Sequence, residues 1–145
     1  MTDDELLRAF ESREVPADGF HHAQHVRVAW CYLRRHPLPD ALGRFRDGLR
    51  AFAAAQGSPE RYHETITTAY VLLIAAALDE GGRPMSWDEF AAAYPDLLSW
   101  TPSILTRYYT ETTLWSPEAR RTFVAPDLPG AGPLILTADS PLARR

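Results

Sequence analysis

The chain has 145 residues, a formal net charge of −4 and 46% hydrophobic residues, values that are ordinary for a globular domain. A chain of this length suits one domain and buries enough surface to need no disulfides. Cys31 is its only cysteine, which excludes an internal disulfide framework and favours a reducing, cytoplasmic location. All fifteen basic residues are arginine, which excludes chemistry that needs a lysine Schiff base or a Walker A loop.

Membranes and nucleic acids are disfavoured as partners. The longest apolar run, 69–78, has ten residues, about half of what a membrane span needs. The acidic residues that follow Met1 do not resemble a signal peptide. The net negative charge argues against nucleic acid, because phosphate binding needs a basic face. We therefore expect a cytoplasmic protein, and its arginine-rich, asparagine-free composition is typical of a GC-rich bacterial genome.

Helix signals follow one another along the chain. Thr2 with Glu5, and Ser86 with Glu89, form capping boxes, and Ser58-Pro59 resembles an N-cap followed by a proline at the first helical position. Apolar residues at steps of three and four fill the segments between breaks at proline and glycine. The patterns predict helices that begin at Thr2 and that cover about 21–35, 42–57, 58–78, 86–94, 101–109 and 116–123.

The predicted fold class is all-α, because no segment shows sustained alternation with period two. We expect a compact single-domain bundle of about six to seven helices over residues 1–123. The tail, 124–145, contains four prolines and two glycines and cannot continue a helix. Within it, Leu134-Ile135-Leu136 is expected to pack against the helices, with disorder beyond it.

Four of the five histidines lie in two short clusters, each near the start of a predicted helix. In the first cluster, His22 and His25 are three residues apart and share the helix face that continues to Tyr32. His21 is expected to be the cap residue. The rings of His22 and His25 are therefore predicted to point into the core.

The second cluster contains His63 and Glu64. His63 begins a stripe at helical spacing, so we expect it one turn into its helix and buried. If the two helices pack side by side and parallel, the imidazoles of His22, His25 and His63 converge at one end of the bundle.

Convergent imidazoles with a carboxylate are the ligands expected for zinc, iron, nickel or copper. We expect a divalent transition metal, iron or zinc first, held by His22, His25, His63 and Glu64 with one position open for chemistry. Glu64 would be a fourth ligand or a base acting on metal-bound water. The alternative is that these histidines cap helices or pack in the core, and that Glu64 only complements the helix dipole.

Four further side chains are candidates for contacts to a small-molecule substrate or ligand. Thr67 lies one turn beyond His63 and would face the same pocket. Arg107 is suited to clamp the carboxylate of an acidic substrate, and Tyr108 with Tyr109 would form a polar aromatic wall. The alternative is ordinary packing with surface charge.

Several strings of the chain resemble a group of small bacterial helical proteins. The strings are Phe20-His21-His22-Ala23-Gln24-His25, Tyr62-His63-Glu64-Thr65, and Ser116-Pro117-Glu118-Ala119-Arg120 followed by Pro126-Asp127. They match the group's F-x-H-x-x-H, Y-H-E-T and S-x-x-A-R…P-D segments. The resemblance implies that His22, His25, His63 and Glu64 are the positions to test, and it carries no activity with it.

Three hypotheses for the function follow. The first is a metal-dependent enzyme that acts on a small molecule by hydrolysis, elimination or oxygen chemistry. The second is a non-catalytic helical module that binds a ligand or senses a metal. The third is a structural or interaction protein whose histidines merely pack. A homodimer is compatible with each.

Overall fold

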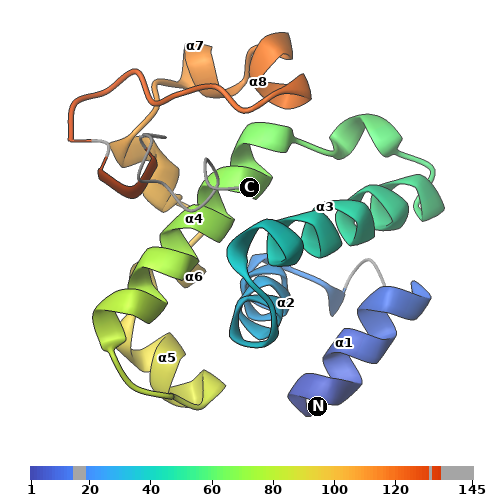
Figure 1. The fold of residues 1–145 in the computed structure, drawn as a ribbon. Helices are drawn as coiled ribbons and strands as arrows, with labels where there is room; N and C mark the ends of the chain where they lie inside the picture. Colours follow the sequence, from blue (N-terminus) through green and yellow to red (C-terminus); the bar gives the residue numbers. More distant parts are fainter. Residues whose placement is uncertain (15–18, 131, 135–145) are drawn as a thin grey trace. The chain divides into compact units, whose positions relative to one another are not determined.

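The structure, a computed structural model, describes residues 1–14, 19–130 and 132–134. It contains two compact units, residues 1–62 and 63–145. The described residues form eight α-helices and no β-strand, which confirms the all-α prediction (Figure 1). None of the described helices is long and apolar enough to span a bilayer.

Unit 1 contains three long helices and one short one: α1 (Asp3–Ser12), α2 (His22–Arg35), α3 (Leu38–Ala55) and the 3-10 helix η2 (Pro59–Arg61). The first three pack against one another (Figure 1). α1 begins at its predicted capping box. The Thr2 hydroxyl accepts the N–H of Glu5 at 3.1 Å, and the Glu5 carboxylate accepts the N–H of Thr2 at 2.9 Å.

Aromatic rings fill the centre of unit 1. Phe10 of α1 lies 5.6 Å from Phe20, 6.4 Å from Tyr32 and 6.2 Å from Phe45, measured between ring centroids. Gly48 of α3 makes this packing possible, because a Cβ at that position would lie 2.2 Å from the Phe10 ring. The core of unit 1 therefore depends on a close approach of α3 to Phe10.

Polar contacts join α1 to α2 at the edge of this core. The guanidinium of Arg27 donates two hydrogen bonds to Asp3, at 2.9 and 2.7 Å. Arg35 pairs with Asp4, and the Tyr32 hydroxyl donates to Glu11 at 2.8 Å. Because these contacts repeat along both helices, they fix the register of α1 against α2.

Unit 2 is built around its longest helix, α4 (Glu64–Gly81). All six residues from Ala69 to Ile74 are buried, as expected for a helix that is apolar on every side. α4 ends at Gly82, whose φ of +67° is the left-handed conformation that glycine adopts at helix ends. Contacts to α4 come from α8, from α6 and from η4 (Figure 1).

Short helices make up the rest of unit 2. They are α5 (Trp87–Ala93), α6 (Pro95–Leu98), η3 (Ile104–Arg107), α7 (Glu111–Leu114), α8 (Pro117–Arg121) and η4 (Gly132–Leu134). Four of them begin at a serine or threonine whose hydroxyl accepts a backbone N–H: Ser86, Ser103, Thr110 and Ser116. Two of these caps, at Ser86 and Ser116, were predicted. Side-chain caps thus define the starts of helices too short to be stable alone.

Three sequence predictions of helix position were wrong. Ser58-Pro59 begins only the three-residue η2, and the N-cap of α4 is His63, five residues after the predicted N-cap Ser58. The segment 101–109 contains the short η3 and a cis peptide bond before Pro102 instead of one continuous helix. The four-residue helices α6 and α7 were not predicted, which is why the count of eight exceeds the expected six to seven.

The tail follows its prediction where the structure describes it. No α-helix forms between Thr122 and Gly130, and Leu134 is fully buried in η4, which contacts α4. The packing expected for Ile135 and Leu136, and the disorder expected beyond them, concern residues outside those described. The division of the chain at residue 123 stays a prediction.

Candidate functional site

His63 is the N-cap residue of α4 and not a residue of its first turn. Its Nδ1 accepts the N–H of Ile66 at 3.1 Å. Its Nε2 lies 2.7 Å from the carbonyl oxygen of Leu114, which can only accept, so Nε2 carries the proton. The ring is therefore neutral, and burial lowers the pKa of His63, which favours this form. Both ring nitrogens are used by the backbone.

The three threonines that follow His63 donate hydrogen bonds to backbone carbonyls and to a carboxylate. The Thr67 hydroxyl donates to the carbonyl of His63 at 2.8 Å, and the Thr68 hydroxyl donates to the carboxylate of Glu64 at 3.2 Å. The Thr65 hydroxyl donates to the carbonyl of Thr122 at 2.8 Å and accepts the N–H of Val124 at 3.0 Å. Through Thr65, the Y-H-E-T string thus connects the start of α4 to residues 122–124, which follow α8.

Asp127, three residues after Val124, accepts hydrogen bonds from two threonines at the start of α7. Its carboxylate accepts the N–H and the hydroxyl of Thr110, at 2.9 and 2.6 Å, and the hydroxyl of Thr113 at 2.8 Å. The hydrogen bonds from Thr110 hold the pKa of Asp127 below its usual value. Nearby, the Tyr109 hydroxyl donates to the carbonyl of Val124 at 2.6 Å. The Asp127 carboxylate therefore holds Thr110, the N-cap residue of α7, in place.

His22 and His25 belong to unit 1, at the start of α2. His21 is the N-cap residue, as predicted. The ring of His25 lies 4.4 Å from that of Phe20, and its buried Nε2 has no hydrogen-bond partner among the residues that the structure describes. Burial, with smaller effects of the neighbouring His22 and His21, lowers the pKa of His25 to about 4.

The prediction of a metal centre is wrong. Across residues 1–14, 19–130 and 132–134, no group of three or more histidine, cysteine, aspartate or glutamate side chains could hold a metal ion. The physical reason is clearest at His63, whose two ring nitrogens are committed to Ile66 and Leu114. The metal-dependent enzyme therefore lacks its site. The expectation of bound iron or zinc, with nickel or copper as alternatives, no longer has the ligand set on which it was based.

The predicted ligand-binding residues have structural partners. Thr67 and Tyr109 are buried and donate to backbone carbonyls, and burial raises the pKa of Tyr109. The carbonyl of Tyr108 accepts the N–H of Leu128 at 3.0 Å. Arg107 is exposed and pairs with Asp96 at 2.9 Å. A role of these four residues in ligand binding stays a prediction.

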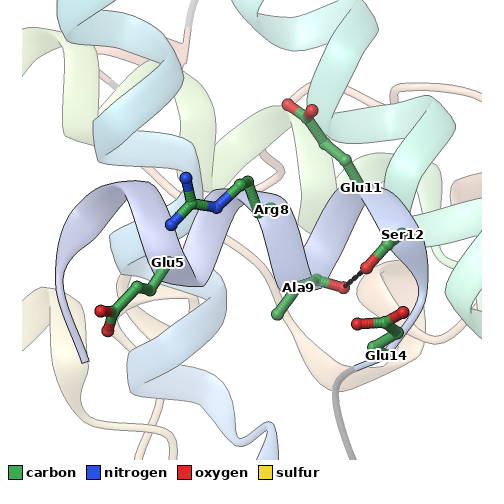
Figure 2. A pocket seen from close by; sticks show the side chains of 6 residues that line it. All are labelled: Glu5, Arg8, Ala9, Glu11, Ser12 and Glu14. Carbon is green, nitrogen blue, oxygen red and sulfur yellow. Dashed lines mark hydrogen bonds between the residues drawn. The ribbon is translucent and has the colours of Figure 1, made fainter.

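A shallow hollow lies on the outer face of α1 (Figure 2). Its lining residues are Glu5, Arg8, Ala9, Glu11, Ser12 and Glu14. All come from α1 or the two residues after it, and Figure 2 shows their side chains spread along one side of the helix. Glu5 and Glu11 already accept hydrogen bonds from Thr2 and Tyr32. This surface has the composition of an ordinary solvated helix face.

Two tryptophans of unit 2, to which the sequence assigned no role, are exposed in the structure. Trp100 is 44% exposed and Trp115 is 49% exposed. The Trp115 ring meets His63 edge-on, with the centroids 5.4 Å apart, and the Trp100 ring lies 6.5 Å from that of Tyr70. Trp115 directly precedes Ser116, the N-cap of α8, and Trp100 lies three residues before Ser103, the N-cap of η3, whereas the buried Trp30 lies within α2.

Comparisons of the chain with protein-family models, with curated proteins and with solved structures gave no match.

Proposed function

We propose that this chain is a non-catalytic helical protein that binds a partner protein through Trp100 and Trp115 of unit 2. The observation that carries the proposal is that both indoles are nearly half exposed. Among the described residues, Met1 is the only other large hydrophobic residue with such exposure. Tryptophan is the residue type most enriched at the centres of protein interfaces. The proposal agrees with the third of the sequence hypotheses.

Trp115 is held firmly in its exposed position. Its backbone N–H donates to the carbonyl of Glu111 at 3.0 Å, and this hydrogen bond closes the C-terminal end of α7. Its ring stands at 86° to that of His63, which is itself fixed by two hydrogen bonds. The guanidinium carbon of Arg120 lies 6.0 Å from the ring centroid. An indole fixed in this way loses little conformational freedom when a partner covers it.

Trp100 is held by a tight turn. It forms an isolated β-bridge with Ser103, and the Ser99 hydroxyl donates to the carbonyl of Pro102 at 2.9 Å. Ser103 in turn shares a hydrogen bond of 2.6 Å with the hydroxyl of Tyr70. The turn therefore anchors the indole to α4.

Both indoles rest on the same helix. His63 caps α4 and Tyr70 lies seven residues further along it, which is about two turns or ~10 Å. The Trp115 ring contacts His63 and has the guanidinium of Arg120 over it, and the Trp100 ring lies next to Tyr70. Two exposed indoles, each held against the same helix, suit recognition of a partner protein.

The nearby polar groups support binding more than catalysis. Proton transfer by His63 would break its hydrogen bond to Ile66 or to Leu114, and thus disturb the start of α4. The Asp127 carboxylate is likewise occupied by Thr110 and Thr113. We further propose that the protein acts in the cytoplasm, as its cysteine content suggests.

The test is site-specific photocrosslinking in the cells that naturally make the protein. Benzoylphenylalanine replaces Trp100 or Trp115 in turn, and replaces the exposed Asp88 of α5 as a matched control in the same unit. We expect one discrete protein adduct that is common to positions 100 and 115 and missing at 88. The purified partner should then bind the wild-type chain at least tenfold more tightly than Trp115→Leu.

Two results would contradict the proposal. One is the same set of adducts at all three positions, which indicates non-specific contact. The other is a partner whose affinity is unchanged by both Trp100→Leu and Trp115→Leu. Circular dichroism of each variant, compared with the wild type, establishes that the fold is intact.

A further inference from the structure

We infer that His63 makes partner binding through Trp115 sensitive to acid: the neutral imidazole holds the indole in its binding position, and a protonated imidazole releases it. This inference rests on the proposed function and names a regulation of the same site. Three features of unit 2 carry it. They are the use of both ring nitrogens of His63, the two contacts between this ring and the pair Leu114-Trp115, and the burial of the ring.

The two hydrogen bonds of the His63 ring can coexist only while the ring is neutral. Nδ1 accepts the N–H of Ile66 at 3.1 Å, and Nε2 donates to the carbonyl of Leu114 at 2.7 Å. In a charged imidazole both nitrogens are donors. The proton on Nδ1 would then face the N–H of Ile66, which is also a donor. Protonation therefore removes the side-chain cap of α4.

The same ring holds Trp115 in two ways. The ring centroids of His63 and Trp115 are 5.4 Å apart, with the ring planes at 86°. Leu114, whose carbonyl accepts the hydrogen bond from Nε2, directly precedes Trp115 in the chain. A charged ring that turns away from Ile66 to reach water changes both contacts. The indole then loses the contacts that fix its position, and a partner that binds it must order it again.

The surroundings of His63 keep the ring neutral at pH 7. The residue is only 6% exposed, so a charged ring there loses most of its hydration. Arg120 of α8 also opposes a positive charge, whereas Glu64 of α4 and the carbonyl of Leu114 on α7 favour it. Burial is the largest of these effects, and it holds the pKa of His63 below its ordinary value. The release of Trp115 is therefore confined to acid.

Trp100 provides an internal comparison. Its ring lies 6.5 Å from that of Tyr70, whose hydroxyl shares a hydrogen bond of 2.6 Å with Ser103. Burial raises the pKa of Tyr70, so this residue stays neutral throughout the acid range. Acid should therefore change the surroundings of Trp115 and leave those of Trp100 unchanged.

The first experiment uses the purified full chain labelled with 5-fluorotryptophan. Fluorine NMR from pH 8 to pH 5 follows each indole, and nitrogen NMR follows the ring of His63. We expect the Trp115 signal to shift with the same midpoint as the His63 ring, while the Trp100 signal stays constant. His63→Asn can still accept the N–H of Ile66 but takes up no proton, so its Trp115 signal should not shift. Asp127→Asn, the matched control on α7, should keep the shift.

The second experiment measures the affinity of the crosslinked partner for the full chain by calorimetry. Linkage to one proton predicts that the affinity at one pH unit below the His63 midpoint is about tenfold lower than at pH 7.5. In His63→Asn this change should be absent, which separates the titration of His63 from that of groups on the partner. Circular dichroism over the same pH range follows the fold.

Three results would overturn the inference while a common adduct at positions 100 and 115 leaves the proposed function standing. The first is a Trp115 signal that stays constant while His63 titrates. The second is an affinity with the same pH dependence in wild type and His63→Asn. The third is global unfolding before His63 takes up its proton. The lack of a common adduct, in contrast, overturns the proposed function and this inference together.

Discussion

The Nε2 of His63 donates to the carbonyl oxygen of Leu114 across 2.7 Å, although the two residues are 51 positions apart in the chain. The same ring accepts the N–H of Ile66 through Nδ1, so one imidazole caps α4 and ties the end of α7 to it. This contact explains why the Y-H-E-T string contains a histidine without requiring a metal. The His63 ring also contacts the Trp115 ring edge-on, with the centroids 5.4 Å apart.

Replacing His63 should destabilise unit 2. His63→Ala removes the cap of α4 and leaves the carbonyl of Leu114 without this donor, so we expect a loss of about 2–3 kcal/mol in the free energy of unfolding. Urea unfolding followed by circular dichroism measures it. The exposed Thr112→Ala, in the same unit, should change the free energy by less than about 0.5 kcal/mol. Equal effects of the two substitutions would contradict the role given to His63.

Asp127 should make unit 2 sensitive to acid. Its pKa is lowered in the folded state by the hydrogen bonds from Thr110, so the carboxylate stabilises the fold above its ordinary pKa. That stability is lost as the pH falls through the folded-state pKa. Asp127→Asn should therefore lower the melting temperature at pH 7 and reduce its decrease with acid, whereas Asp88→Asn should do neither. A melting temperature of Asp127→Asn that matches wild type at pH 7 would refute this role.

His25 should make the stability of unit 1 depend on pH, in a higher pH range than the one in which Asp127 acts. Its folded-state pKa of about 4 lies below the ordinary value of 6.5, because burial beside Phe20 disfavours the charged ring. The unfolded chain therefore takes up a proton first, and stability falls as the pH drops from about 6.5 to 4, by up to about 3 kcal/mol. His25→Leu should remove most of this dependence. Unfolding curves at several pH values measure it, and an unchanged slope would disprove the assignment.

Gly48 offers a test of packing with an internal control. Gly48→Ala would place a Cβ 2.2 Å from the Phe10 ring, so we expect a loss of about 1–3 kcal/mol. Gly43 lies in the same helix with nothing within 4 Å of such a Cβ, so Gly43→Ala should stabilise by about 0.5–1 kcal/mol. Thermal unfolding of both variants measures these changes in stability. Effects of the same sign would contradict the close approach of α3 to Phe10.

Local signals made much of the fold predictable. The capping boxes at Thr2 and Ser86 involve residues three positions apart, and the structure forms both. The start of α2 at His21 and the cap at Ser116 are equally local. Helices of only four residues, such as α7, have barely more than one turn, which is too short to show a repeating apolar pattern. Their formation depends on long-range contacts such as the hydrogen bond from Thr110 to Asp127, 17 positions along the chain.

The candidate site could not be predicted in the same way. Ser58-Pro59 is a stronger local start signal than His63, so sequence reasoning placed the ring of His63 one turn too far inside the helix. The contact that decides its role, with Leu114, is long-range and leaves no periodic pattern. The exposure of Trp115 is also set by distant residues, since it depends on how α7 and α8 meet α4.

The state of the His63 ring tests the account most directly. Nitrogen NMR of the histidine side chains at pH 7, with and without one equivalent of zinc, reports which ring nitrogen carries the proton and whether a metal binds. We expect a neutral ring protonated at Nε2 whose signals do not move when zinc is added. A ring nitrogen of His63 that shifts in step with stoichiometric zinc would contradict it.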